Sequence, residues 1–121
     1  MVARVLGAAT VAYSVAIIAS PRVLAAPCGL TTATGGLTTA TRVLIRAIGA
    51  RDAAIGTAMM LAPPGRALRW VALARVASDA SDAILFGTTL STPAARTKVA
   101  VFAAGWATLC AAAAVLAGPA S

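Results

Sequence analysis

The acidic residues of this chain are three aspartates that lie inside long apolar stretches: Asp52, Asp79 and Asp82. Three arginines share the same stretches: Arg46, Arg51 and Arg75. A charged side chain at the centre of a bilayer costs about 2.5–3.5 kcal/mol even on the mildest scale, so such groups pair with one another or serve a function. These six residues are therefore the first place to look for chemistry.

The second half of this group lies along one stripe of a predicted helix. Each helical residue advances about 100°, which places Arg75, Asp79, Asp82 and Phe86 on one face. Like charges three residues apart disfavour ionisation of both carboxyls at once. A carboxylic acid beside a carboxylate suits general acid–base chemistry. We expect Asp79 or Asp82 to donate a proton, Asp52 to accept one, and Arg75 to stabilise developing negative charge.

The helix that carries Asp52 contributes small residues on the same face as this acid. Glycines at this spacing allow close approach of another helix. Arg51 points to a different side and is expected to make another contact. The predicted binding or pocket residues around the acids are Arg46, Gly49, Arg51, Gly56 and Phe86.

Composition predicts an integral membrane protein of helical type. Hydrophobic residues make up 60% of the chain and charged residues 11%, against about 25% charged in soluble proteins. The mean hydropathy is +0.92. The apolar runs are Ala-rich and lack the alternation of a membrane β-barrel. The predicted fold is an all-α, integral membrane four-helix bundle in one domain, residues 1–121.

Prolines and length place four membrane spans, because proline ends helices and about 20 residues cross the hydrocarbon layer. The predicted spans are about 2–19, 42–61, 66–90 and 94–117. An antiparallel turn at Pro63-Pro64-Gly65 would bring Asp52, Arg75 and Asp79 to one level near the middle of the membrane. The first span also resembles a secretory signal peptide, but Ser20-Pro21-Arg22 interrupts the cleavage region and favours an uncleaved span.

Residues 23–41 form a Thr- and Gly-rich segment with a tandem repeat, 29–34 and 36–41. It predicts a loop, or a short interfacial helix that caps one mouth of the bundle. Its functional interpretation is a lid over a site.

Charge and cysteine content limit the classes of partner and cofactor that the protein is expected to bind. The net charge of +7 fits arginines that meet anionic lipid headgroups, and no basic stripe with interleaved aromatics indicates nucleic acid. The chain has no His and only Cys28 and Cys110, so we predict no metal and no cofactor; whether the two thiols pair is left open. The basic residues divide almost evenly between the two ends of the predicted bundle. The small excess at the end away from the termini favours an orientation with both termini outside the cytoplasm. The predicted location is the bacterial inner membrane.

The pattern Arg46-x-x-Gly49-x-Arg51-Asp52-x-x-x-Gly56 resembles a family of small four-helix membrane proteins of bacteria and fungi, mostly of unknown activity. The resemblance covers residues 42–90, and it implies a Gly-x-Arg-Asp element in the second helix and an acid-bearing third helix. The Thr-rich repeat departs from that family. The Asp-Arg-Asp grouping is also chemically similar to limonene-type epoxide hydrolases, an analogy of chemistry and not of fold.

Three functions remain open at this point. The first is a membrane-embedded, cofactor-independent acid–base enzyme that acts on a lipophilic small molecule by epoxide opening, cyclisation or isomerisation. The second is a non-catalytic accessory subunit of a membrane complex, in which the charges fix helix packing. The third is a small proton-linked transporter that works as a homo-oligomer.

Overall fold

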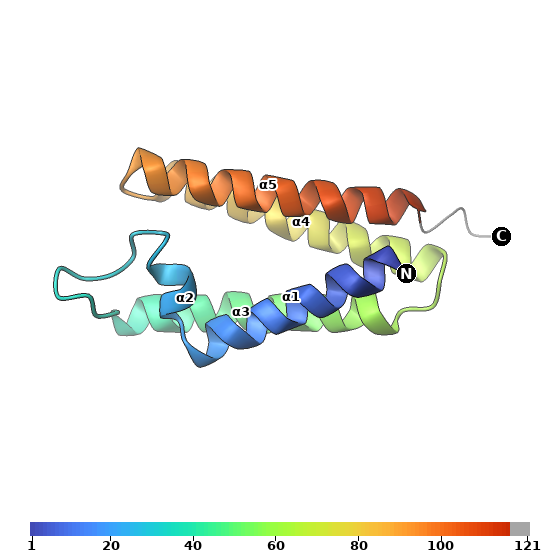
Figure 1. Ribbon diagram of the computed structural model, residues 1–121, viewed down its shortest axis with the longest axis horizontal. Coiled ribbons are helices and arrows are strands. Elements are labelled where there is room, and N and C mark those ends of the chain that lie inside the picture. Colours follow the sequence, from blue (N-terminus) through green and yellow to red (C-terminus); the bar gives the residue numbers. More distant parts are fainter. Residues whose placement is uncertain (117–121) are drawn as a thin grey trace.

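The computed structural model describes residues 1–116; most of those residues are helical, and none of them forms a β-strand. Four long helices and one short helix follow one another along the chain (Figure 1). They are α1 (Val2–Ala19), α2 (Arg22–Ala25), α3 (Thr39–Leu61), α4 (Arg66–Thr89) and α5 (Pro93–Leu116). The long helices lie within three residues of the predicted spans at their described ends; the predicted end at residue 117 lies outside the described residues.

The start of α3 differs most from the prediction, because capping begins the helix three residues early. Thr38 adopts an extended backbone and its hydroxyl accepts a hydrogen bond from the Thr41 N–H. Such a side chain satisfies a helix N–H that has no partner within the helix. The second threonine repeat thus contains the N-cap and the first residues of α3.

The first threonine repeat forms a turn instead. Gly29 and Gly35 have positive φ angles of 66° and 75°, a conformation that side chains rarely adopt. The Thr32 hydroxyl accepts a hydrogen bond from the Gly36 N–H. The segment therefore combines a short helix, α2, with a tight loop at one end of the bundle.

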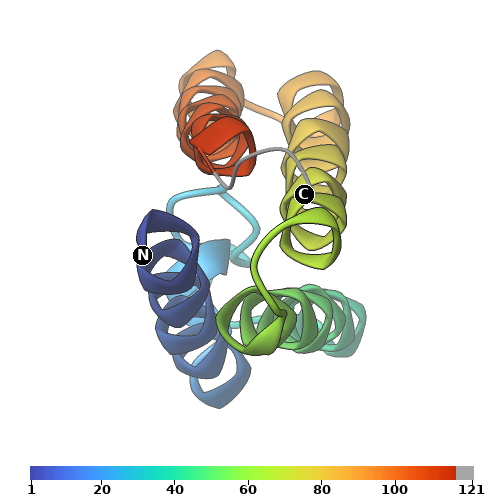
Figure 2. The same cartoon turned by 90° about the vertical axis from the view of Figure 1, so that its right-hand side faces the viewer.

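The four long helices form two closely packed pairs (Figure 2). Helix α1 packs along α3, and α4 packs along α5. The two pairs meet less extensively, mainly between α3 and α4. This arrangement leaves room between the pairs, which is where the polar residues lie.

Two glycines make the α1–α3 contact as close as backbone allows. A Cβ atom on Gly56 would lie 2.8 Å from the Gly7 carbonyl oxygen, and one on Gly7 would lie 2.7 Å from the Gly56 carbonyl oxygen. Small residues at such positions let helices associate without a hydrophobic driving force.

Two of the four long helices, α1 and α5, are long and apolar enough to cross a membrane. Only 28% and 22% of their most apolar windows are buried within the protein. Helices α3 and α4 are less apolar because they carry the internal charges. The polar centre thus lies on α3 and α4, which meet between the two pairs, and each of them packs against an apolar partner.

Candidate functional site: an Asp–Arg network beside an interhelical cavity

Arg51 of α3 and Asp82 of α4 form the outer ion pair of the site. Arg51 Nη1 donates to Asp82 Oδ1 at 3.1 Å, and Nη2 donates to Oδ2 at 2.6 Å. Two parallel bonds of this kind fix both position and orientation. The Arg51 side chain is 36% exposed and that of Asp82 is 16% exposed, so this pair lies at the edge of the polar centre.

Arg75 and Asp79 form the inner ion pair, one turn apart on α4. Arg75 Nε lies 2.9 Å from Asp79 Oδ2, and Nη2 lies 2.5 Å from Oδ1. Both side chains are buried. The guanidinium therefore holds both carboxylate oxygens of Asp79.

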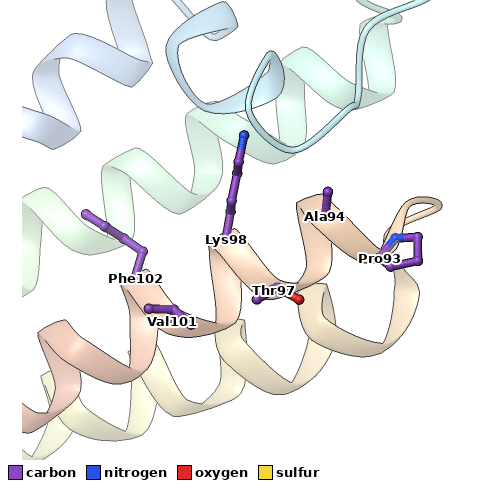
Figure 3. A pocket seen from close by; sticks show the side chains of 6 residues that line it. All are labelled: Pro93, Ala94, Thr97, Lys98, Val101 and Phe102. Atoms are coloured by element: carbon purple, nitrogen blue, oxygen red, sulfur yellow. The ribbon is translucent and has the colours of Figure 1, made fainter.

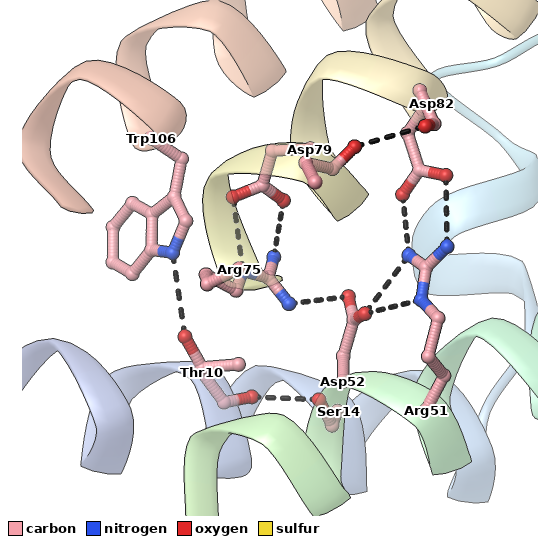
Figure 4. A network of polar contacts seen from close by, with 10 residues as sticks. Thr10, Ser14, Arg51, Asp52, Arg75, Asp79, Asp82 and Trp106 are labelled. Atoms are coloured by element: carbon pink, nitrogen blue, oxygen red, sulfur yellow. Dashed lines mark hydrogen bonds and ion pairs between the residues drawn. The ribbon is translucent and has the colours of Figure 1, made fainter. Parts of the chain in front are cut away.

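Asp52 lies between the two arginines and joins the pairs into one chain of contacts (Figure 4). Its Oδ1 accepts a hydrogen bond from Arg51 Nε at 2.9 Å. Its Oδ2 lies 2.9 Å from Arg75 Nη1, an ion pair without the angle of a hydrogen bond. Arg51 Nη2 also lies 2.9 Å from Oδ1. Asp52, which is 95% buried, thus contacts both guanidinium groups but lacks the two parallel hydrogen bonds that Asp79 and Asp82 each accept.

The network contains three carboxylates and two guanidinium groups, which gives a formal charge of −3 + 2 = −1. The third predicted arginine, Arg46, does not join it. Arg46 is exposed, and its Nε donates to the Ile18 carbonyl oxygen at 3.4 Å. The one-to-one balance that the sequence suggests is therefore not present at the site.

A cavity of about 510 Å³ lies between the two helix pairs and reaches this network. Its size falls within the range of small-molecule sites, roughly 300–1,000 Å³. Three carboxylates and Arg75 line one side, and the remaining wall is mainly aliphatic and aromatic. The aromatic residues that line it are Tyr13, Phe86, Phe102 and Trp106.

Aromatic side chains of α1 and α5 form part of the cavity wall. The rings of Tyr13 and Phe102 lie 6.1 Å apart between centroids, and those of Phe102 and Trp106 lie 6.3 Å apart. Trp106 Nε1 donates to the Thr10 hydroxyl at 3.3 Å. The cavity is thus lined by aromatic rings as well as by the charged groups of the network.

The structure brings together four predicted catalytic residues and two of the predicted pocket residues. Asp52, Asp79, Asp82, Arg75 and Phe86 line the cavity, and Arg51 joins the network behind them. Gly49 and Gly56 are not among the lining residues and instead contact α1. A Cβ atom on Gly49 would lie 2.7 Å from Ile18 Cγ1.

Several lining residues were not predicted as site residues, among them Thr10, Tyr13, Lys98 and Phe102. A weak signal was present for Thr10, which lies four residues before Ser14 on an otherwise apolar helix. Ser14 is fully buried and donates to the Thr10 carbonyl oxygen at 2.7 Å. Aromatic residues gave no such signal, because packing and lipid contact produce the same pattern.

The cysteines occupy separate places and both are free thiols. Cys28 is buried in the loop after α2 and lines the cavity, and burial raises its pKa above the ordinary value. Cys110 is buried in α5 within a cluster that includes Met59 and Leu68. In residues 1–116 no cluster of His, Cys, Asp and Glu has the make-up of a metal site.

No protein-family model, curated protein or solved structure matches this chain.

Proposed function

We propose that this protein is a four-helix bundle within a membrane and that all four long helices cross the bilayer. The outward surface supports this, because large apolar residues are exposed on every long helix, including Val5, Val43, Ile84 and Val101. Exposed apolar surface on this scale marks an interaction surface, here with lipid. The internal charges of α3 and α4 face the other helices, as such groups do in membrane proteins.

We infer that the cavity binds a lipophilic small molecule and that the Asp–Arg network performs acid–base chemistry on it. The observation that carries this proposal is the contact between a mainly apolar cavity and a network with one more carboxylate than guanidinium. Arginine stays protonated in proteins. One proton on a carboxyl group would therefore make the network neutral.

Asp52 is the best place for that proton. Asp79 and Asp82 each receive two N–H donors from one guanidinium, an arrangement that favours the ionised form. Asp52 contacts both guanidinium groups, but it accepts one hydrogen bond, on Oδ1, and its Oδ2 has only an ion-pair contact. This assignment makes Asp52 both the donor and the later acceptor of the proton, in place of a donor at Asp79 or Asp82.

The two arginines then act as positioning groups. Each fixes one flanking aspartate and one oxygen of Asp52, so the guanidinium charges stabilise Asp52 once it has given its proton to the ligand. Protonation of a ligand oxygen followed by return of a proton to Asp52 fits isomerisation and cyclisation. Epoxide opening requires in addition a water molecule that attacks carbon.

Infrared spectroscopy tests the location of the proton without a known substrate. A protonated carboxyl gives a C=O band that a carboxylate lacks. We expect this band in the wild-type protein at neutral pH, its loss in Asp52→Asn, and its retention in Arg46→Met, which changes a charge of α3 outside the network. The absence of the band from wild type, or its survival in Asp52→Asn, would contradict the assignment.

Native mass spectrometry of the purified protein tests the cavity. We expect a discrete lipophilic molecule to leave the bundle on activation. A chain that carries no such molecule, and that assembles with other subunits only when the network is intact, would favour a structural subunit.

A further inference from the structure

Two hollows adjoin on the first half of α5 and share two lining residues. The first is the cavity beside the network, and the second is a shallow, open groove on the outer surface that residues of α5 alone line. Lys98 and Phe102 line both. Figure 3 shows these two side chains extending from α5 toward the other helix pair. They therefore stand at the boundary between the protein interior and its surroundings.

Phe102 and Tyr13 are the aromatic part of this boundary. Phe102 is 60% exposed and Tyr13 is 37% exposed, although both line the cavity. Their contact lies between α1 and α5, helices that touch along only a short stretch. An exposed ring needs only a change of rotamer to move aside, on a timescale of picoseconds to nanoseconds.

Lys98 gives the boundary a positive charge. Within residues 1–116 no carboxylate pairs with Lys98, because the three aspartates are held by Arg51 and Arg75. Lys98 also lies at the most basic end of the bundle, where α3 and α5 begin. The basic residues of this end are Arg22, Arg42, Arg46, Arg96 and Lys98.

We propose that the groove and the cavity together bind a single-chain amphiphile with an anionic head, a long-chain carboxylate or its equivalent. Its head contacts Lys98, and its chain passes Phe102 and Tyr13 into the cavity. The inference rests on the proposed function and names its ligand class. The ligand enters sideways, from the lipid, through the seam between α1 and α5.

The combination of charges favours an anion over a cation at the entrance. A cationic head would meet the ammonium of Lys98 and the positive potential of four arginines at this end. The lipophilic chain matches the mainly apolar wall formed by residues such as Ile17, Ile48 and Val99. In this arrangement the Asp–Arg network lies beside the hydrocarbon chain of the ligand and not beside its anionic head. The acid–base chemistry is therefore directed at the hydrocarbon chain.

Tryptophan fluorescence supplies a direct measurement, because Trp106 lines the cavity and Trp70 is exposed on α4. In the full-length Trp70→Phe variant, in a nonionic detergent, a fatty acid with brominated chain carbons should quench Trp106 in a saturable manner. Its methyl ester should bind more weakly. The Trp106→Phe variant reports unspecific partition into the micelle through Trp70, and its quenching should rise linearly for both probes.

Substitution of Lys98 tests the head contact. Lys98→Met should weaken binding of the fatty acid by about fivefold, the scale of an exposed charge pair, and leave the ester unchanged. Lys98→Arg should keep the preference for the acid. Arg22→Met removes the same charge from the same end without touching either hollow and should change acid binding by less than Lys98→Met.

The outcomes separate this inference from the proposed function. Equal saturable binding of acid and ester, or equal effects of Lys98→Met and Arg22→Met, would overturn the anionic head while leaving a lipophile-binding cavity intact. Saturable quenching of Trp70 instead of Trp106 would overturn the placement of the chain. The infrared band of Asp52 is independent of both probes.

Discussion

Trp106 of α5 donates its indole N–H to the Thr10 hydroxyl of α1, and so links the two helix pairs beside the ion network (Figure 4). The Thr10 carbonyl oxygen in turn accepts a hydrogen bond from Ser14. Thr10 is 4% exposed, so water does not compete for this contact. The link holds α1 near α5 beside the aromatic residues of the cavity.

Replacing either partner of this link should loosen the two pairs slightly. We expect Trp106→Phe and Thr10→Val each to lower the free energy of unfolding by about 1 kcal/mol, the usual net value of such a bond. The double variant should lose less than the sum of the two. Strictly additive losses, measured by thermal unfolding in detergent, would show that the bond contributes nothing.

Arg51 and Arg46 offer a matched pair on one helix. Arg51→Met should lower the free energy of unfolding by about 1–2 kcal/mol, reduced from the value for a buried pair because Arg51 is 36% exposed. Arg46→Met should change it little, since Arg46 is exposed and makes one long hydrogen bond. Thermal unfolding in detergent measures both variants. An equal loss of unfolding free energy in Arg51→Met and Arg46→Met would contradict the ion pairs of Arg51 with Asp52 and Asp82.

Asp79 and Asp52 should differ in stability as well as in protonation. Asp79→Asn removes one half of a buried bidentate pair, at a cost of about 3 kcal/mol. Asp52→Asn leaves both bidentate pairs intact and replaces the carboxyl that the proposal makes neutral, so its cost should be clearly smaller. Denaturant titration of both variants measures the difference, and a larger loss for Asp52→Asn would count against the neutral-network argument.

Gly56 and Gly105 test the close contact between α1 and α3. An added methyl at Gly56 would lie 2.8 Å from the Gly7 carbonyl oxygen, whereas one at Gly105 would meet nothing within 4 Å. Gly56→Ala should therefore destabilise the bundle, and Gly105→Ala should leave it unchanged or stabilise it by up to about 1 kcal/mol. Circular dichroism during heating gives both values. A loss of stability of similar size in both variants would refute the contact.

The sequence predicted the long helices well because prolines and glycine mark their ends. Pro63-Pro64-Gly65 separates α3 from α4, and Gly65 has a φ angle of 93°. The meeting of Asp52 with Arg75 also followed from equal distances to that turn, and the two side chains lie 2.9 Å apart. Local rules were sufficient wherever the partners are joined by a short turn.

The rest depended on how distant helices pack. Arg46 and Arg51 lie five residues apart on α3. Only the packing of α4 against α3 determines that Arg51, and not Arg46, pairs with Asp82. The cavity was also beyond prediction, because it lies between two helix pairs whose separation no periodicity encodes. Lys98 and Phe102 became site residues only once α5 was placed.

The Pro63-Pro64-Gly65 turn has a consequence for the bilayer insertion that the proposed membrane fold requires. Each of α3 and α4 alone would carry its charges into hydrocarbon without partners. The proposed fold therefore implies that the two helices enter together, as a hairpin whose arginines and aspartates already neutralise one another.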